Sequence, residues 1–240
     1  MAAFLKHLLG GQGSPQGPAA PAGEAPPQWA VASPHMEDAA FLRAYAAGKA
    51  TGSWWNADLE WRASIVCWAA LQGSMLDGDF VECGVHRGGY ARMVIDYVGF
   101  QALRRKTFHL VDSYCGVPEA FRSGSAALFD GIYDDCYADV VRTFAPWDNV
   151  RIVRGIVPDV LEAVLPRRVA FLSIDLNSAE PSARTLEHFW PLMAPGAAVV
   201  LDDYNFDLFA DQREALDEAA AKIRAPILAL PTDQGLIVKR

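Results

Sequence analysis

The stretch Asp79-Phe-Val-Glu-Cys-Gly-Val-His-Arg-Gly-Gly89 decides the fold of this 240-residue chain. It predicts a short strand over 80–83, a glycine-rich turn, and a helix that we expect over 91–100. Glycines at 84, 88 and 89 permit a tight turn and let a ligand approach the backbone. The spacing is G-x-x-x-G-G and not the G-x-G-x-x-G of dinucleotide-binding turns. The stretch therefore favours a nucleoside-type ligand without a strong phosphate contact.

Apolar runs and helical patterns alternate through the rest of the chain. We expect further strands at 107–111, 150–153, 169–174, 197–201, 227–230 and 236–239. We expect helices near 133–144, 160–164, 182–190 and 211–223. This alternation predicts an α/β fold with a doubly wound, mostly parallel, seven-stranded sheet. The last two strands are close enough to form a hairpin, which would place an antiparallel strand at the edge.

The composition before residue 77 predicts two further segments. Residues 1–35 are rich in Gly, Pro and Ala and predict a flexible tether. Residues 36–76 predict a helical extension that packs beside the main domain over 77–240. Its second helix, near 58–72, carries apolar side chains on or near one face: Trp61, Ile65, Trp68 and Leu71.

Charge and cysteine usage exclude several classes of protein. The net charge is −8 and no basic stripe is present, so we expect no nucleic-acid partner. No stretch has the length of a membrane span, and the first residues lack the order of a secretory signal. The four cysteines form no C-x-x-C pair, which is typical of a reduced, cytoplasmic protein. We expect Cys67 and Cys83 to pack as small apolar residues.

Three acids follow two of the expected strands at the point where each strand ends. Asp175 comes after the apolar run 169–174, and the pair Asp202 and Asp203 comes after 197–201. Ligands of open α/β sheets collect at the carboxyl ends of strands. Carboxylate oxygens are the ligands that Mg²⁺ prefers. The sequence therefore predicts a divalent-cation site formed by these three acids, such as a magnesium site.

Two more acids lie near the glycine-rich turn. Asp112 ends the second strand, where an acid would bind ribose hydroxyls, and Ser113 follows it. A structural cap is the competing role for Asp112. Glu82 is unusual for a buried strand and would bind either a cationic group of the ligand or the N–H groups of the loop.

Several of these segments resemble motifs of the macrocin O-methyltransferase (TylF-type) family. The stretch 79–89 is similar to the first motif of that family, and Leu110-Val-Asp-Ser-Tyr-Cys-Gly116 is similar to the second. Val150-Arg-Ile-Val-Arg-Gly155 resembles the third segment. Leu172-Ser-Ile-Asp175 and Leu201-Asp-Asp-Tyr204 resemble the metal-site segments. The resemblance extends from about Asp79 to Arg240.

The resemblance implies a class I, Rossmann-like methyltransferase that uses S-adenosylmethionine and Mg²⁺ to methylate a hydroxyl. The family's cofactor-binding roles fall on Glu82, Gly84, Gly88 and Asp112, with Ser113 beside them. Its metal ligands fall on Asp175, Asp202 and Asp203. The chain departs from the family at His86, where an aromatic residue is usual, and at Asn177, where a second acid is usual. We therefore expect altered substrate contacts near 176–182.

Several residues are candidates for the chemistry. Asp175 is our first candidate for a double role as ligand and general base, and His86 is the second because it titrates near neutrality. We expect His109 in the core and His188 in helix packing. The loop 115–130, with Phe121, Arg122 and Phe129, would close over the substrate or serve as a connector. Trp54 and Trp55 would line a pocket or pack in the core.

The acceptor and the oligomeric state stay open. A sugar or phenolic hydroxyl is expected by analogy with natural-product and glycan methyltransferases, and a homo-oligomer is possible. A non-catalytic or altered nucleoside-binding protein on the same fold is the alternative. An NAD-dependent oxidoreductase is less favoured, because the Tyr-x-x-x-Lys match at 45–49 precedes the glycine-rich turn.

Overall fold

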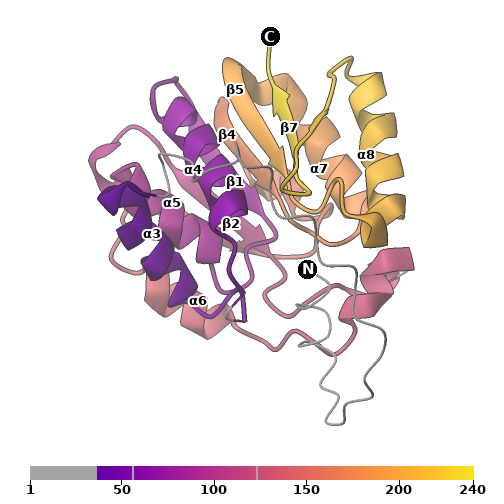
Figure 1. The fold of residues 1–240 in the computed structure, drawn as a ribbon, viewed down its shortest axis with the longest axis horizontal. Helices are drawn as coiled ribbons and strands as arrows, with labels where there is room; N and C mark the ends of the chain where they lie inside the picture. Colours follow the sequence, from indigo (N-terminus) through magenta and orange to yellow (C-terminus); the bar gives the residue numbers. More distant parts are fainter. Residues whose placement is uncertain (1–36, 56, 123) are drawn as a thin grey trace.

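The computed structural model describes residues 37–55, 57–122 and 124–240. The expected tether over 1–35 lies outside the described residues. Figure 1 shows the described chain as a central sheet with helices packed on both of its faces. Its strands are β1 (Asp79–Cys83), β2 (Phe108–Asp112), β3 (Val150–Arg154), β4 (Val169–Ile174), β5 (Met193–Leu201), β6 (Leu228–Ala229) and β7 (Gly235–Val238).

The sheet has the order β3-β2-β1-β4-β5-β7-β6. The strands from β3 to β5 are parallel, whereas β7 runs antiparallel to both β5 and β6. The doubly wound, mostly parallel sheet of seven strands is thus confirmed, and so is the antiparallel hairpin at its edge. The strand order reverses between β1 and β4, which is where ligands bind in such sheets.

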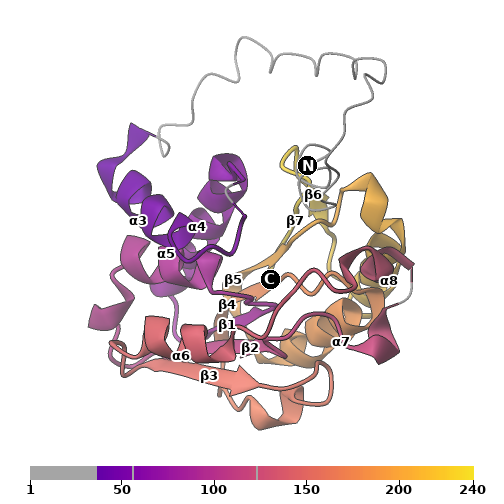
Figure 2. The same ribbon diagram turned by 90° about the horizontal axis from the view of Figure 1, so that it is seen from below.

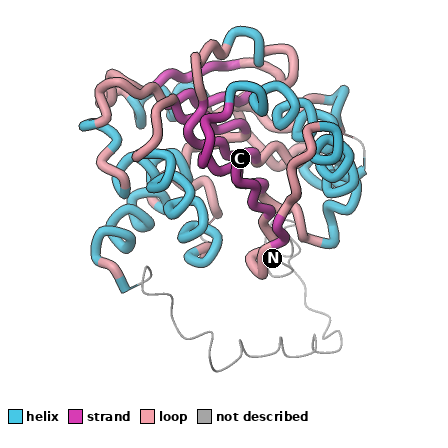
Figure 3. Tube along the Cα trace, turned by 90° about the horizontal axis from the view of Figure 1, so that it is seen from above, coloured by secondary structure: helices cyan, strands magenta, loops and turns pink. Residues whose placement is uncertain are grey.

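Two helical layers cover the two faces of the sheet (Figures 2 and 3). The first layer holds α3 (Ala39–Lys49), α4 (Glu60–Ser74), α5 (Gly89–Tyr97) and α6 (Tyr137–Phe144), and the second holds α7 (Ala179–Phe189) and α8 (Ala210–Lys222). Side chains alternate between the layers along each strand because the strand period is two. Phe80 therefore packs under the first layer and Val81 under the second.

Helix α4 leaves exposed three of the four apolar side chains that its pattern singled out, whereas Ile65 packs against the core. Trp61, Trp68 and Leu71 are all more than a third exposed. The face turned to the sheet carries mostly small residues, including Ala63, Ala69, Ala70 and Gly73. A Cβ added at Gly73 would lie 2.6 Å from the Ala170 carbonyl oxygen, so only a glycine permits this approach of helix and strand. Close backbone packing, and not the aromatic stripe, sets the orientation of α4.

Element boundaries differ from the sequence expectations by a few residues. Helix α7 begins at Ala179 and accommodates Pro181 in its first turn, where a missing N–H costs no helical hydrogen bond. Helix α6 begins only at Tyr137, and the short helix expected near 160–164 is a 3₁₀ turn over Leu161–Ala163. Cys67 and Cys83 are buried as expected. Within the described chain, no helix combines the length and apolarity that a membrane crossing requires.

Candidate active site at the carboxyl ends of the strands

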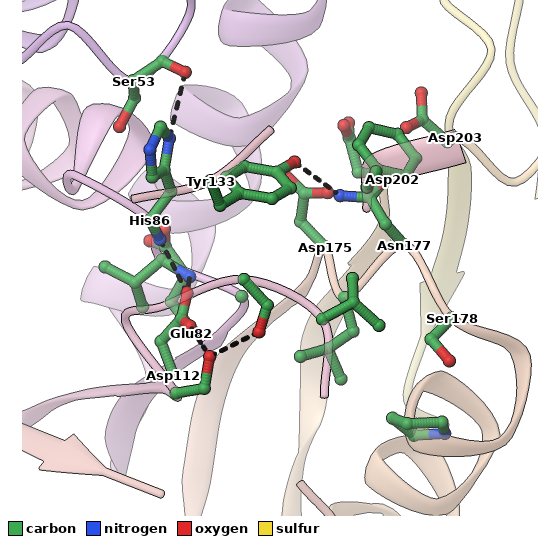
Figure 4. A pocket seen from close by; sticks show the side chains of 18 of the residues that line it. Ser53, Glu82, His86, Asp112, Tyr133, Asp175, Asn177, Ser178, Asp202 and Asp203 are labelled. Atoms are coloured by element: carbon green, nitrogen blue, oxygen red, sulfur yellow. Dashed lines mark hydrogen bonds between the residues drawn. The ribbon is translucent and has the colours of Figure 1, made fainter. Parts of the chain in front are cut away.

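One pocket lies at the carboxyl ends of β1, β2, β4 and β5 (Figure 4). Nearly all of the predicted site residues line it: Glu82, Gly84, His86, Asp112, Ser113, Asp175, Asp202 and Asp203. Gly88 is beside the pocket, at the start of α5. The strand topology thus brings both halves of the predicted site together.

The three acids of the predicted metal site lie together. Each of Asp175, Asp202 and Asp203 offers a carboxylate oxygen, and these oxygens lie within 4.8 Å of one another. The reason is the register of β4 and β5, which pairs Ile174 with Leu201 and so places the residues after them side by side. Burial and the charge of Asp202 raise the pKa of Asp175, and the same two causes raise the pKa of Asp203 to about 7. Hard oxygen ligands in this arrangement fit a divalent cation.

A buried arginine that the sequence analysis did not select contacts two of these acids. Arg62 of α4 places Nη1 2.8 Å from Asp202 Oδ2 and Nη2 2.7 Å from Asp203 Oδ1. Burial disfavours the charged form of Arg62, but Asp202 and Asp203 outweigh that effect and raise the pKa of the guanidinium. The helical extension therefore supplies a charged group to the site and is more than a neighbouring support.

Asp112 fixes the glycine-rich turn. The N–H groups of Val85 and His86 both donate to Asp112 Oδ2, at 2.6 and 2.7 Å, and the Tyr114 N–H donates to Oδ1 at 2.7 Å. These contacts are those of a structural cap, although the side chain also lines the pocket. The Ser113 hydroxyl donates to the Gly116 carbonyl at 2.7 Å.

Gly84 and Gly88 both have positive φ, at 89° and 85°. A Cβ at Gly84 would overlap the carbonyl oxygen of Asp175, and one at Gly88 would overlap the Phe144 ring. Glycine is thus required at both positions for steric reasons as well as for backbone conformation.

Two buried polar groups beside the turn have an unused hydrogen-bonding atom. Glu82 is 2% exposed, and the Ala91 N–H binds its carboxylate. Among the described residues, Glu82 Oε2 and the Tyr90 hydroxyl have no hydrogen-bond partner. Burial raises the pKa of Glu82, with a smaller contribution from Asp112. Buried polar atoms without partners that line a pocket fit a polar ligand such as the amino-acid part of S-adenosylmethionine.

His86 belongs to an aromatic cluster at the mouth of the turn. Its ring stacks on Trp55 with centroids 4.9 Å apart and meets Tyr133 edge-on at 5.0 Å. His86 Nδ1 lies 3.3 Å from the Ser53 carbonyl oxygen, and burial lowers the pKa of His86. Burial therefore favours the neutral form of the imidazole. Trp54 is buried against Tyr45 and Tyr90 while also lining the pocket.

The long loop after β2 contributes a wall of the pocket. Figure 4 shows Tyr133 extending between His86 and Asn177, whose side-chain N–H donates to the Tyr133 hydroxyl at 3.3 Å. Phe129 stacks on Tyr133 and lines the pocket. Arg122 instead pairs with Asp130 at 2.6 Å, and Phe121 contributes its carbonyl to Ser178. Of the three loop residues named from the sequence, Phe129 is the one that lines the pocket.

The two other histidines of the described residues, His109 and His188, lie outside the pocket. His109 Nε2 is 3.3 Å from Asp79, at the start of the strands, and is not fully buried. His188 is near the end of α7, with its ring edge-on to Phe189. Four residues of the site were not selected from the sequence: Arg62, Tyr90 and Tyr133, which line the pocket, and Gln234, which donates to Asp202 at 3.0 Å. Only Arg62 carried a signal, as the one cation in the sequence of α4.

Comparison with known proteins agrees with this geometry. A seven-stranded sheet with this order and a pocket of this kind defines a class I, Rossmann-like methyltransferase fold. The profile of the macrocin-O-methyltransferase (TylF) family matches residues 65–234, and the chain belongs to this family.

Relatives with known roles are O-methyltransferases of natural-product pathways. Demethyldecarbamoylnovobiocin O-methyltransferase from Streptomyces niveus is 28% identical over 167 residues, which are 65% of this chain and 63% of the relative. Mycinamicin III 3''-O-methyltransferase from Micromonospora griseorubida is 27% identical over 53% of this chain and 55% of the relative. The chain thus spans less than two thirds of the length of these relatives.

Solved structures show the same fold. The O-methyltransferase NovP superposes with a TM-score of 0.65 at 24% identity, over 74% of this chain and 79% of NovP. The calicheamicin methyltransferase CalS11 superposes with a TM-score of 0.55 at 17% identity, over 86% of this chain and 93% of CalS11.

Proposed function

We propose that this protein transfers a methyl group from S-adenosylmethionine to a hydroxyl of a small natural-product or glycan acceptor, on a sugar or a phenol. The observation that carries the proposal is one pocket that joins a glycine-rich turn with unpaired polar groups to three clustered carboxylates. Family membership and the reactions named for the relatives support it.

The turn after β1 is suited to hold the methyl donor. Glu82 Oε2 and the Tyr90 hydroxyl would bind the polar amino-acid part, and Gly84 lets the donor approach the backbone. Asp112 would bind ribose hydroxyls while it caps the turn, with Ser113 beside it. When bound, S-adenosylmethionine supplies an electrophilic methyl group. The contribution of this chain is to align the two reactants, which is worth up to roughly 7–11 kcal/mol in well-oriented reactions.

The three acids would hold Mg²⁺ and receive the acceptor. A bound divalent cation supplies a positive charge that lowers the pKa of a hydroxyl. Asp175 is our candidate for the base that takes the hydroxyl proton, because burial raises its pKa and so increases its affinity for a proton. His86 is the second candidate, since burial favours its neutral, proton-accepting form and it lines the same pocket.

Aromatic side chains surround the space beside the acids. Phe129, Tyr133, Phe206 and Phe209 line this part of the pocket. Flat apolar walls bind the rings of phenols and the less polar faces of sugars, while Asn177 and Tyr133 offer hydrogen bonds. An acceptor with a ring system next to its hydroxyl is therefore the best fit.

The decisive test separates donor binding from methyl transfer. Asp202→Asn and Asp203→Asn should each lose at least about a hundredfold in S-adenosylhomocysteine formation on a panel of glycosylated and phenolic acceptors. Both variants should still bind S-adenosylhomocysteine in calorimetry, because the turn after β1 is untouched. Asp112→Ala should instead weaken that binding. Full turnover by both asparagine variants in EDTA would contradict the metal role.

A non-catalytic nucleoside-binding protein is the second candidate function. Asn177 favours this second function, because its amide stands where the family usually has an acid. The same amide donates a hydrogen bond to the Tyr133 hydroxyl. Tight binding of S-adenosylhomocysteine without methylation of any acceptor in the panel would support this second function.

A further inference from the structure

Arg62 is placed to act on the acidic cluster from outside the segment that matches the family profile. It lies on α4, three residues before the match begins at residue 65, and is 7% exposed. Three of its nitrogens have partners near the end of β5. Nε donates to the Thr232 carbonyl at 2.9 Å, Nη1 donates to Asp202 at 2.8 Å, and Nη2 is 2.7 Å from Asp203.

The two aspartates are held differently. Asp202 is fixed from two sides, because Gln234 Nε2 donates to Oδ1 at 3.0 Å while Arg62 binds Oδ2. Asp203 Oδ1 forms an ion pair with Arg62 Nη2 at 2.7 Å. Arg62 therefore holds Asp203 from one side, by the attraction between their charges. Neither Arg62 nor Gln234 donates a hydrogen bond to Asp175 within the described chain.

The charges of this group are unequal. Asp175, Asp202 and Asp203 carry three negative charges when ionised, and Arg62 carries one positive charge, which leaves a net charge of −2. Three ionised carboxylates this close together repel one another strongly in a buried site. A cation beside them relieves this repulsion when no metal is present. The same cation also repels an approaching metal ion.

We propose that Arg62 is the resident counter-cation of the acidic cluster, which holds Asp202 and Asp203 in place without metal and limits the affinity for the divalent cation. This role rests on the metal site of the proposed function. Arg62 is thus a positioning residue, because its guanidinium and the metal ion would share the carboxylates of Asp202 and Asp203. One divalent ion would balance the net charge of −2 that Arg62 and the three ionised acids leave.

The test measures metal binding directly, with neither methyl donor nor acceptor present. Arg62→Met removes the charge and keeps much of the length, while Arg62→Lys keeps the charge and loses the fork that spans both acids. Calorimetric titration with MgCl2 should show Arg62→Met binding at least about tenfold more tightly than the wild type, because one repulsive charge is gone. Arg62→Lys should stay within about threefold of the wild type.

Thermal unfolding supplies a second readout. In EDTA, Arg62→Met should unfold at a lower temperature than the wild type, because buried carboxylates lose their counter-charge. Added Mg²⁺ should raise its unfolding temperature by more than it raises that of the wild type. If Arg62→Met cannot be purified, Arg62→Gln, purified in Mg²⁺, serves as the neutral variant.

The possible failures are distinct. If the wild type binds Mg²⁺ and the neutral variant binds it equally or more weakly, the role of Arg62 is overturned and the metal site stands. No Mg²⁺ binding by the wild type or the neutral variant overturns the metal site and this inference together. Calorimetry with S-adenosylhomocysteine then tells whether the methyl-donor site of the proposed function survives.

Discussion

At the scale of single residues, the site depends on positions that accept only one type of residue, for steric or electrostatic reasons. Gly84 is the clearest case, because its backbone lies in the left-handed region and it lies against Asp175, the residue that follows β4. This contact joins the glycine-rich turn to the carbonyl of Asp175. The two halves of the site are therefore in direct contact through the backbone.

Gly84→Ala should destabilise the protein by about 3 kcal/mol or more, because it adds a backbone clash to the strain of a positive φ. Gly131→Ala is the matched control: its φ is 69°, but no atom lies within 4 Å of the added Cβ. The control should cost about 1–2 kcal/mol. Urea unfolding of the two variants measures the difference, and equal losses would show that the clash is relieved by movement.

His86 should make stability depend on pH. Burial lowers its pKa in the folded protein, with Arg87 acting in the same direction and Asp112 and Asp134 opposing. As the pH falls below the ordinary value of about 6.5, the unfolded chain binds a proton that the folded chain does not, so stability is lost. His86→Asn tolerates the positive φ of 49° and removes this proton site.

The free energy of unfolding of His86→Asn should therefore fall less than that of the wild type between about pH 7.5 and about pH 5.5. Urea titrations across this range measure the slope for each protein. Identical slopes would show that other groups dominate the pH dependence.

At the scale of elements, the orientation of α4 decides whether the extension reaches the site. The periodicity of its apolar residues indicated a face that carries Trp61, Trp68 and Leu71, and these three side chains are more than a third exposed. Small residues form the face that packs on the sheet, because they let the helix backbone approach β4 and β5 closely. This close approach brings Arg62 to Asp202 and Asp203. Periodicity identified the helix, whereas packing density selected the face.

Gly73→Ala should move α4 away from the sheet. The added Cβ would lie 2.6 Å from the Ala170 carbonyl and 3.0 Å from Phe171 Cβ, so we expect a loss of about 1–3 kcal/mol. Gln72→Ala, one position away and only half-buried, should change stability by less than about 1 kcal/mol. Chemical denaturation compares the two, and a neutral Gly73→Ala would show that α4 adjusts freely.

At the scale of the whole molecule, the extension and the main domain share one core. Phe41, Ala63 and Val66 from the extension belong to the same buried cluster as Phe80, Phe108 and Phe171 of the sheet. The sequence predicted a boundary at residue 77 between a helical extension and the main domain. Because the described residues on both sides of this boundary share one core, they favour a single folding unit.

A chain that begins at Asp77 should fail to fold, because it exposes the apolar face of the sheet and leaves Asp202 and Asp203 without Arg62. A chain that begins at Glu37 keeps every contact described above and serves as the control. Far-UV circular dichroism and thermal unfolding distinguish the two. A cooperative transition in the shorter chain would show that the sheet domain is independent.

The sequence by itself determined the sheet, the glycine-rich turn and the acidic cluster. Buried parallel strands appear as continuous apolar runs, and parallel order brings the residues after them to one edge. Only the tertiary structure decided that Arg62 meets Asp202, 140 positions later, and that Tyr133 lies between His86 and Asn177. These contacts depend on how closely a helix and a loop pack on the sheet, and no local pattern of residues records that distance.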